Sequence, residues 1–279
     1  MSVTTADTPA QSRQAFPAAG VRRFGAVNWL GMWTLYTKEV RRFTKIKTQT
    51  VVAPMITTLL YLAVFALSVG SLRPAVHGVP FIVFLAPGLI MMTMIQNAFA
   101  NTSSALLISK VQGNVVDYLM PPLSPGELNV GIASAGVSRG LIVGTATAVA
   151  MIPFVGIGVA HLWAIVFFAL GASLMLSLLG IIAGIWSEKF DHLQAVTNFV
   201  LLPLTFLSGT FYSVDQLPAF AHAITHWNPI FYLIDGFRYG FTGHADGSVM
   251  IGVATTVAVN AGLWLVSDRL FRKGYRLKS

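Results

Sequence analysis

The sequence predicts an all-α membrane protein with several membrane-spanning helices, on the basis of composition, segment length and charge placement. Of its 279 residues, 55% are hydrophobic and only 10% are charged. Soluble domains carry about 25% charged residues, so this chain has too little polar surface to face water on all sides. Its apolar residues also form stretches of roughly 20 or more, the length that a helix needs to cross a membrane.

The net charge of +8 gathers near the two ends of the chain. Eight of the 18 Lys and Arg residues lie in residues 1–47, and five lie in residues 269–279. Basic clusters beside spans are typical of cytoplasmic segments, so membrane orientation explains the charge and no nucleic-acid partner is expected. The chain has no cysteine, which excludes disulfides and cysteine-ligated metals.

The N-terminal part divides into a tail and an amphipathic helix. Residues 1–28 are polar and rich in Pro and Ala, which predicts a disordered cytoplasmic tail rather than a signal peptide. Residues 29–47 predict an interface helix that lies in the lipid headgroup plane; a solvated helix packed on a partner is the alternative. The aromatic and apolar face is predicted to hold Trp29, Trp33, Tyr36, Val40 and Phe43, and the basic face Lys38, Arg41, Arg42 and Lys45.

Residues 48–268 predict a transmembrane domain of six helices. The predicted spans cover residues 48–71, 80–108, 128–155, 162–186, 193–211 and 248–266. An even number of spans with basic ends predicts that both termini are cytoplasmic, including a basic tail at 269–279. Between the last two spans, residues 213–241 contain two short apolar pieces separated by Asn228-Pro229, which predicts a re-entrant helical hairpin. Asp235 and Arg238 are helical neighbours within it.

The elbow, residues 110–127, joins the second and third spans. In Ser124-Pro125-Gly126-Glu127, Ser at the N-cap, Pro at N1 and Glu at N3 predict a capping box that starts a helix. Upstream, a short amphipathic helix is predicted to end before Pro121-Pro122. Such a stiff elbow with apolar side chains favours docking of a soluble partner, although an inert turn remains an alternative.

The elbow sequence GNVVDYLMPPLSPGEL and the stretch FLSGTFYSVDQLPAFAHAITHWNPIFYLIDGFRYGF resemble the type-2 ABC exporter permeases over residues 29–270. The resemblance implies a bacterial inner-membrane permease of several spans that forms a dimer and moves a lipid, glycan, lipo-oligosaccharide or drug. It implies a separate ATPase subunit that holds ATP and Mg²⁺. It implies that the elbow docks on that ATPase through Val111, Val115, Val116, Asp117, Tyr118, Leu119, Pro121, Pro122, Ser124 and Glu127.

The sequence lacks the motifs of an enzyme. No Gly-Lys dipeptide is present, so the phosphate-binding GxxxxGK[ST] loop is excluded, and no cofactor is expected in this chain. Gly136-Val-Ser138-Arg-Gly140 matches the nucleophile-elbow pattern G-x-S-x-G, but it lies in a helical apolar run, where small residues favour helix packing. His222 and His226 lack a third ligand, so no metal site and no catalytic residue are predicted.

Polar residues within the second span leave two interpretations open. Asn97 and Asn101 are four residues apart and predict an inward-facing stripe beside Gln96, which either lines a cargo path or joins two helices. Arg139 is expected on a third helix that begins outside the hydrocarbon core. An ion-coupled secondary transporter is the alternative function, but the carboxylates lie at loops and helix ends rather than within spans.

Overall fold

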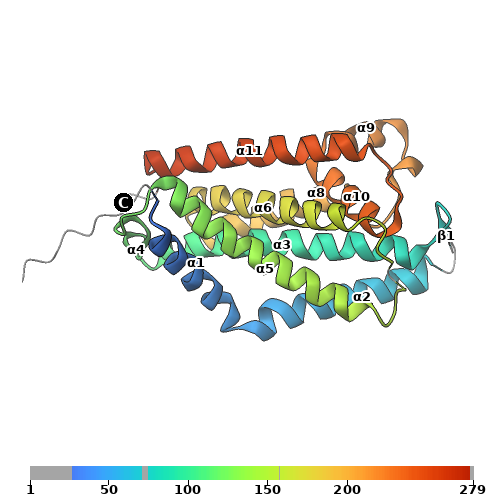
Figure 1. The fold of residues 1–279 in the computed structure, drawn as a ribbon, viewed down its shortest axis with the longest axis horizontal. Coiled ribbons are helices and arrows are strands. Elements are labelled where there is room, and N and C mark those ends of the chain that lie inside the picture. The colour runs from blue at the N-terminus through green and yellow to red at the C-terminus, as the bar shows by residue number, and fades with distance from the viewer. Residues whose placement is uncertain (1–26, 71–74, 157, 277–279) are drawn as a thin grey trace, which may run out of the picture.

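The computed structural model describes residues 27–70, 75–156 and 158–276. Five helical segments in these ranges are long and apolar enough to cross a membrane, and they run roughly parallel along the molecule (Figure 1). Their bounds are Thr48–Ser68, formed by a π-helical turn (Thr48–Val52) and α2 (Ala53–Ser68), then α3 (Phe81–Val111), α5 (Pro125–Met151), α6 (Leu162–Trp186) and α11 (Val249–Lys273). The predicted all-α membrane class is confirmed at this level.

The predicted fifth span, residues 193–211, differs from the others. It contains α7 (Phe190–Val196), a π-helical turn (Thr197–Leu201) and α8 (Leu202–Phe206). These 17 consecutive residues would reach about 26 Å as a regular helix, slightly less than the hydrocarbon core. Gly209 then takes a positive φ of 71°, which directs the chain out of the helical path. The structure therefore shows five candidate spans rather than six.

Shorter elements surround the long helices. α1 (Trp29–Thr44) precedes the first span, and α4 (Val116–Leu119) lies in the elbow. A hairpin of β1 (Ala75–Val76) and β2 (Val79–Pro80), absent from the sequence prediction, joins α2 to α3. A 3₁₀ turn (Val214–Gln216), α9 (Ala219–Trp227) and α10 (Pro229–Thr242) follow α8, and the break between α9 and α10 falls at Asn228 as expected.

The predicted N-terminal and C-terminal tails differ in how much of each the structure describes. The predicted tail at 1–28 falls almost entirely outside the described residues. At the other end, α11 continues to Lys273, so the first residues of the predicted basic tail, 269–273, are helical. Arg272 on its last turn binds Asp268 at 2.6 Å.

α3 is the central helix, because it packs against both α5 and α6 and most of its apolar window is buried inside the chain. Glycines allow these helices to approach closely. A Cβ on Gly180 of α6 would lie 2.6 Å from the carbonyl oxygen of Phe99 in α3, and one on Gly140 of α5 would lie 2.9 Å from Ser173 Oγ. The close packing of the core therefore depends on glycines, which have no side chain, as well as on apolar side chains.

Replacing Gly180 by alanine is expected to destabilise the fold by about 1–3 kcal/mol, the range for overpacking, because backbone cannot move aside as a flexible side chain can. Thermal unfolding of the purified protein in detergent measures the effect. Gly262→Ala is the matched control: it lies in α11 with open space around its Cα, and alanine there should be neutral or stabilising. Equal stability of the two variants would contradict the packing argument.

Candidate functional site

The elbow between α3 and α5 is a structured joint. α4 ends at Leu119, immediately before Met120 and the Pro121-Pro122 corner. The predicted capping box is present: Glu127 N donates to Ser124 Oγ at 3.3 Å, and Ser124 N donates to Glu127 Oε2 at 2.6 Å. The first turn of α5 is therefore fixed on both sides of its cap.

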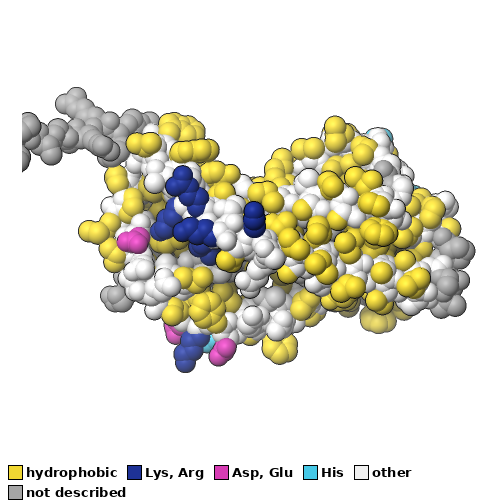
Figure 2. Space-filling model, turned by 90° about the horizontal axis from the view of Figure 1, so that it is seen from below, with side chains coloured by type: hydrophobic (Ala, Val, Ile, Leu, Met, Phe, Trp, Pro, Cys, Tyr) yellow, Lys and Arg dark blue, Asp and Glu magenta, His cyan; other side chains and the backbone are white. Residues whose placement is uncertain are grey.

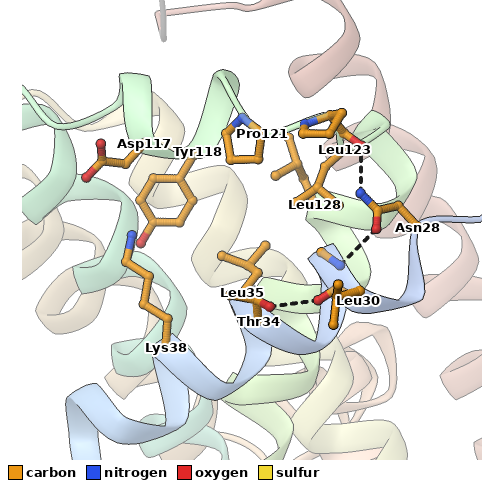
Figure 3. Close-up of a pocket in the computed structure, with 12 residues that line it drawn as sticks. Asn28, Leu30, Thr34, Leu35, Lys38, Asp117, Tyr118, Pro121, Leu123 and Leu128 are labelled. Carbon is orange, nitrogen blue, oxygen red and sulfur yellow. Dashed lines mark hydrogen bonds between the residues drawn. The ribbon is translucent and has the colours of Figure 1, made fainter. Parts of the chain in front are cut away.

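Glu127 also ties the elbow to the start of α1. Its other oxygen, Oε1, accepts a hydrogen bond from Asn28 N at 2.6 Å. The Asn28 side chain caps α1 by accepting from Gly31 N, and its Nδ2 donates to Pro122 O at 3.0 Å (Figure 3). One short segment thus connects the N-cap of α1, the proline corner and the N-cap of α5.

A second contact joins α1 to α4 through a buried carboxylate. Tyr118 is 6% exposed and Glu39 is 1% exposed. The Tyr118 hydroxyl donates to Glu39 Oε1 at 2.5 Å, and Glu39 Oε2 accepts from Arg42 Nε at 2.9 Å. Arg42 then donates through Nη2 to Asn101 O of α3 at 2.7 Å. Four side chains or backbone groups from three helices therefore form one connected network.

The charge of Glu39 affects the protonation of its neighbour. Burial and the adjacent Glu39 carboxylate raise the pKa of the Tyr118 hydroxyl well above its usual range, so Tyr118 stays a hydrogen-bond donor at every physiological pH. The ammonium group of Lys38 lies 4.3 Å from the centre of the Tyr118 ring (Figure 3). Lys38 and Tyr118 line a cavity of about 280 Å³ between α1 and the elbow.

The outer face of the elbow is apolar and exposed, although Tyr118 is not part of it. The exposed side chains are Val111, Val116, Leu119 and Met120, with exposed fractions of 56, 52, 38 and 79%. Asp117 and Pro122 are also exposed, while Val115 and Pro121 are half-buried. Of the residues predicted to dock a partner, Tyr118 instead holds the elbow to α1.

The face of α1 that packs on the protein overlaps the predicted aromatic face at Phe43. Met32, Leu35, Glu39 and Phe43 are buried, whereas Trp29 and Trp33 are 73% and 64% exposed. The reason is the packing of α1 on α5, where Gly131 leaves room for Leu35. Tyr36 and Val40 are half-buried, and Lys38, Arg41 and Lys45 are exposed. Figure 2 shows Lys and Arg gathered on one half of the molecule, beside an apolar half.

Asn97 and Asn101 join helices. Asn97 Oδ1 accepts from Arg139 Nη2 of α5 at 3.0 Å, and Asn101 Oδ1 accepts from Arg42 Nη2 of α1 at 3.2 Å. Both asparagines are buried within the chain, and Gln96 is half-buried. The stripe was predicted either to line a cargo path or to join two helices, and these contacts are the kind that join helices. Arg139 lies on α5 and reaches into the bundle, where its guanidinium meets α3.

Asp235 and Arg238 lie buried in α10 and bond different partners. Asp235 accepts from the backbone N–H groups of Asp246 and Gly247 at 2.8 and 2.9 Å. Arg238 donates to Phe84 O and Gly209 O, and its guanidinium lies 3.9 Å from the centre of the Phe84 ring. These contacts fix the loop before α11 and the start of α3 to the same helix.

Ser138 has the surroundings of a packing residue. It lies within α5, where its hydroxyl donates to Ser134 O and also contacts the Tyr36 hydroxyl, each at 2.9 Å. A Cβ on the flanking Gly136 would clash with Ser177 and Thr102. A nucleophile elbow requires a turn between a strand and a helix, so the motif match reflects close helix packing.

Replacing Ser124 by alanine is expected to destabilise the elbow by about 1 kcal/mol, the usual effect of removing a helix N-cap. Amide hydrogen exchange over residues 124–128 measures the effect, because the cap residues lose protection when the first turn of α5 frays. The matched control is Ser248→Ala at the N-cap of α11, whose Oγ also accepts a capping bond. Ser248→Ala should increase exchange at the start of α11 and leave residues 124–128 protected. If exchange at residues 124–128 rises equally in both variants, Ser124 does not stabilise the elbow locally.

Sequence comparisons agree with these features. Residues 31–242 match the family described as ABC-2 type transporter. The chain is 37% identical over 255 residues to the inner membrane transport permease YadH of Escherichia coli strain K12, covering 90% of this chain and 98% of that permease. It is 24% identical over 255 residues to nodulation protein J of Rhizobium leguminosarum bv. viciae, covering 89% and 95% of the two chains. The chain belongs to the ABC-2 type transporter family as an inner-membrane permease, a non-catalytic membrane subunit whose ATP is bound by a partner ATPase.

Proposed function

We propose that this chain is the permease of an ATP-driven exporter in which the elbow receives the movement of the ATPase. The carrying observation is the Tyr118–Glu39–Arg42 network, in which Tyr118 and Glu39 are buried beneath an exposed apolar face. The exposed face offers the ATPase a docking surface of Val111, Val116, Leu119 and Met120. The network connects that surface to α1 and α3, so a push on the elbow moves both helices.

The same proposal includes six membrane passes with both termini in the cytoplasm. α1, α4 and the C-terminal end of α11 lie together at one end of the molecule (Figure 1). At that end Arg276 contacts Glu188 at 3.4 Å, just before α7. At the other end Val214 N donates to Asp246. The segment Phe190–Phe206 therefore leads from one end to the other, which supports its assignment as a sixth, shorter pass beside the re-entrant pair α9 and α10.

The cargo path is proposed to lie between two copies of the permease. α3 is enclosed by its own chain, and its buried polar residues Asn97 and Asn101 already bond arginines. A path through the middle of one copy would require these contacts to open. The proposed cargo is a lipid, glycan, lipo-oligosaccharide or drug, with Trp29 and Trp33 of the interface helix turned toward the membrane surface.

Co-expression with its ATPase tests the function. Native mass spectrometry of the purified complex is expected to show two permease chains and two ATPase chains. ATP hydrolysis is expected only when the permease and the ATPase are both present and active. A permease that moves cargo along an ion gradient with no ATPase bound would instead support the secondary-transporter alternative.

A further inference from the structure

We propose a Zn²⁺ site at the end of the molecule opposite the elbow, formed by His77, His244 and Asp246. One nitrogen of each histidine and one oxygen of the carboxylate all lie within 4.8 Å of one another. His77 Nε2 lies 3.6 Å from Asp246 Oδ1, and His244 Nε2 lies 3.8 Å from the same oxygen. Two imidazoles with a carboxylate are a ligand set that Zn²⁺ commonly takes.

Asp246 supplies the observation that points to a cation. Its side chain is only 1% exposed, and Oδ1 makes no hydrogen bond within the part of the chain that the structure describes. A buried carboxylate oxygen without a hydrogen bond is costly. This oxygen points at the two histidine nitrogens, so a bound cation would satisfy it.

The other oxygen of Asp246 is held as a metal ligand requires. Oδ2 accepts from Ser213 Oγ and from Val214 N, each at 2.9 Å. Asp235 in turn fixes the backbone of the loop by accepting from Asp246 N. Carboxylates that bind zinc are usually oriented by such hydrogen bonds on the second oxygen. Oδ1 is therefore presented in a fixed position, free of competing donors among the described residues.

The two histidines approach from separate segments. His77 occupies the tip of the β1–β2 hairpin, followed by Gly78, and His244 lies in the loop between α10 and α11. Their rings stack with centres 4.3 Å apart. Ligands of one tetrahedral Zn²⁺ at bonds of about 2.0–2.1 Å lie about 3.3 Å from each other. The nitrogen–oxygen distances are 3.6 and 3.8 Å, and the two histidine nitrogens lie within 4.8 Å of each other. Zinc binding therefore requires the histidine side chains, which are 28% and 46% exposed, to rotate so that their nitrogens converge.

Zinc is favoured over hard cations because imidazole nitrogen suits it, whereas Mg²⁺ and Ca²⁺ prefer oxygen ligands. Asp215 Oδ2 lies 3.7 Å from His77 Nε2 and is available as a fourth ligand in place of water. On binding, His77 Nε2 must exchange its 3.0 Å contact with Ser213 Oγ for the metal. The bound ion would clip the loop between α2 and α3 to the loop before α11.

Zinc titration of the purified, chelator-treated protein in detergent tests the site by calorimetry, with no need for transport or for the ATPase. The unchanged protein is expected to bind one Zn²⁺ per chain and to gain thermal stability, while Mg²⁺ at the same concentration has no effect. His77→Ala, His244→Ala and Asp246→Asn should each weaken binding by at least about 100-fold, more than the loss of an outer-shell partner causes.

A matched control is available in α9. The rings of His222 and His226 also lie close together, tilted and with centres 4.3 Å apart. Among the described residues they do not form a metal-binding group with a carboxylate. His222→Gln should leave zinc affinity unchanged. No saturable Zn²⁺ binding by the unchanged protein, equal affinity in Asp246→Asn, or loss of the site in His222→Gln would each overturn the proposal, and none of these outcomes bears on the exporter function.

Discussion

Replacing Val116 and Met120 together by aspartate is expected to abolish co-purification of the ATPase while leaving the permease folded. Both side chains are exposed, at 52% and 79%, so the change removes little internal packing. An apolar surface that docks a partner loses affinity sharply when charges enter its centre, because each carboxylate must be desolvated on binding. Loss of two central apolar contacts predicts at least a 100-fold fall in affinity, about 2.7 kcal/mol.

The measurement is pull-down of the ATPase with a tagged permease, quantified against permease recovered. Phe220→Asp is the control: Phe220 is 72% exposed on α9, at the opposite end of the molecule from α4 (Figure 1). It should retain the ATPase fully. Undiminished ATPase recovery with the double variant would show that the elbow's outer face is not the docking surface.

Replacing Glu39 by leucine is expected to lower the free energy of unfolding by about 3 kcal/mol. The change leaves the buried Tyr118 hydroxyl without its acceptor and Arg42 without its carboxylate, and breaking a buried pair in this way costs about 3–5 kcal/mol. Arg42 is partly exposed, which places the effect at the lower end. The elbow should also gain hydrogen exchange, since α4 is held to α1 through this carboxylate.

Thermal unfolding together with amide hydrogen exchange over residues 112–123 measures both effects. Tyr118→Phe removes one hydrogen bond to a charged group and should cost about 1.5–3 kcal/mol, giving an intermediate variant. Arg41→Leu is the control, because Arg41 lies on the same helix but is exposed. Elbow exchange that is the same in Glu39→Leu and Arg41→Leu would mean that the buried carboxylate does not hold the elbow.

Local signals made much of the fold predictable. The capping box at Ser124 and the break at Asn228 depend on residues within a few positions of each other, and both appear where expected. The length of apolar runs predicted five spans that the structure contains. The fifth predicted span is not a regular long helix. Hydropathy does not report the π-helical turn before Pro203 or the positive φ of Gly209, which interrupt it.

The network at the elbow required tertiary information. Glu39 is the only acidic residue in the basic stretch 29–47, and that contrast was the one signal that could have marked it. Nothing local shows that it meets Tyr118, 79 residues away. The buried face of α1 was also missed, because a stripe of aromatics indicates an apolar face without saying whether protein or lipid covers it.

The zinc ligands illustrate the same limit. His77, His244 and Asp246 come from two loops separated by more than 160 residues, so no motif spacing links them. The one histidine pair that spacing did suggest, His222 and His226, lacks the carboxylate that completes the other cluster. Side chains on loops become a site only when the helices between them are in place.

A site-specific crosslink shows whether the ATPase contacts the outer face of the elbow. The chain contains no cysteine, so a single cysteine at Met120 can carry a short photo-crosslinker without competing attachment sites. We expect a nucleotide-sensitive crosslink to the ATPase from position 120 and none from position 220. A crosslink from position 220 with none from position 120 would contradict this contact.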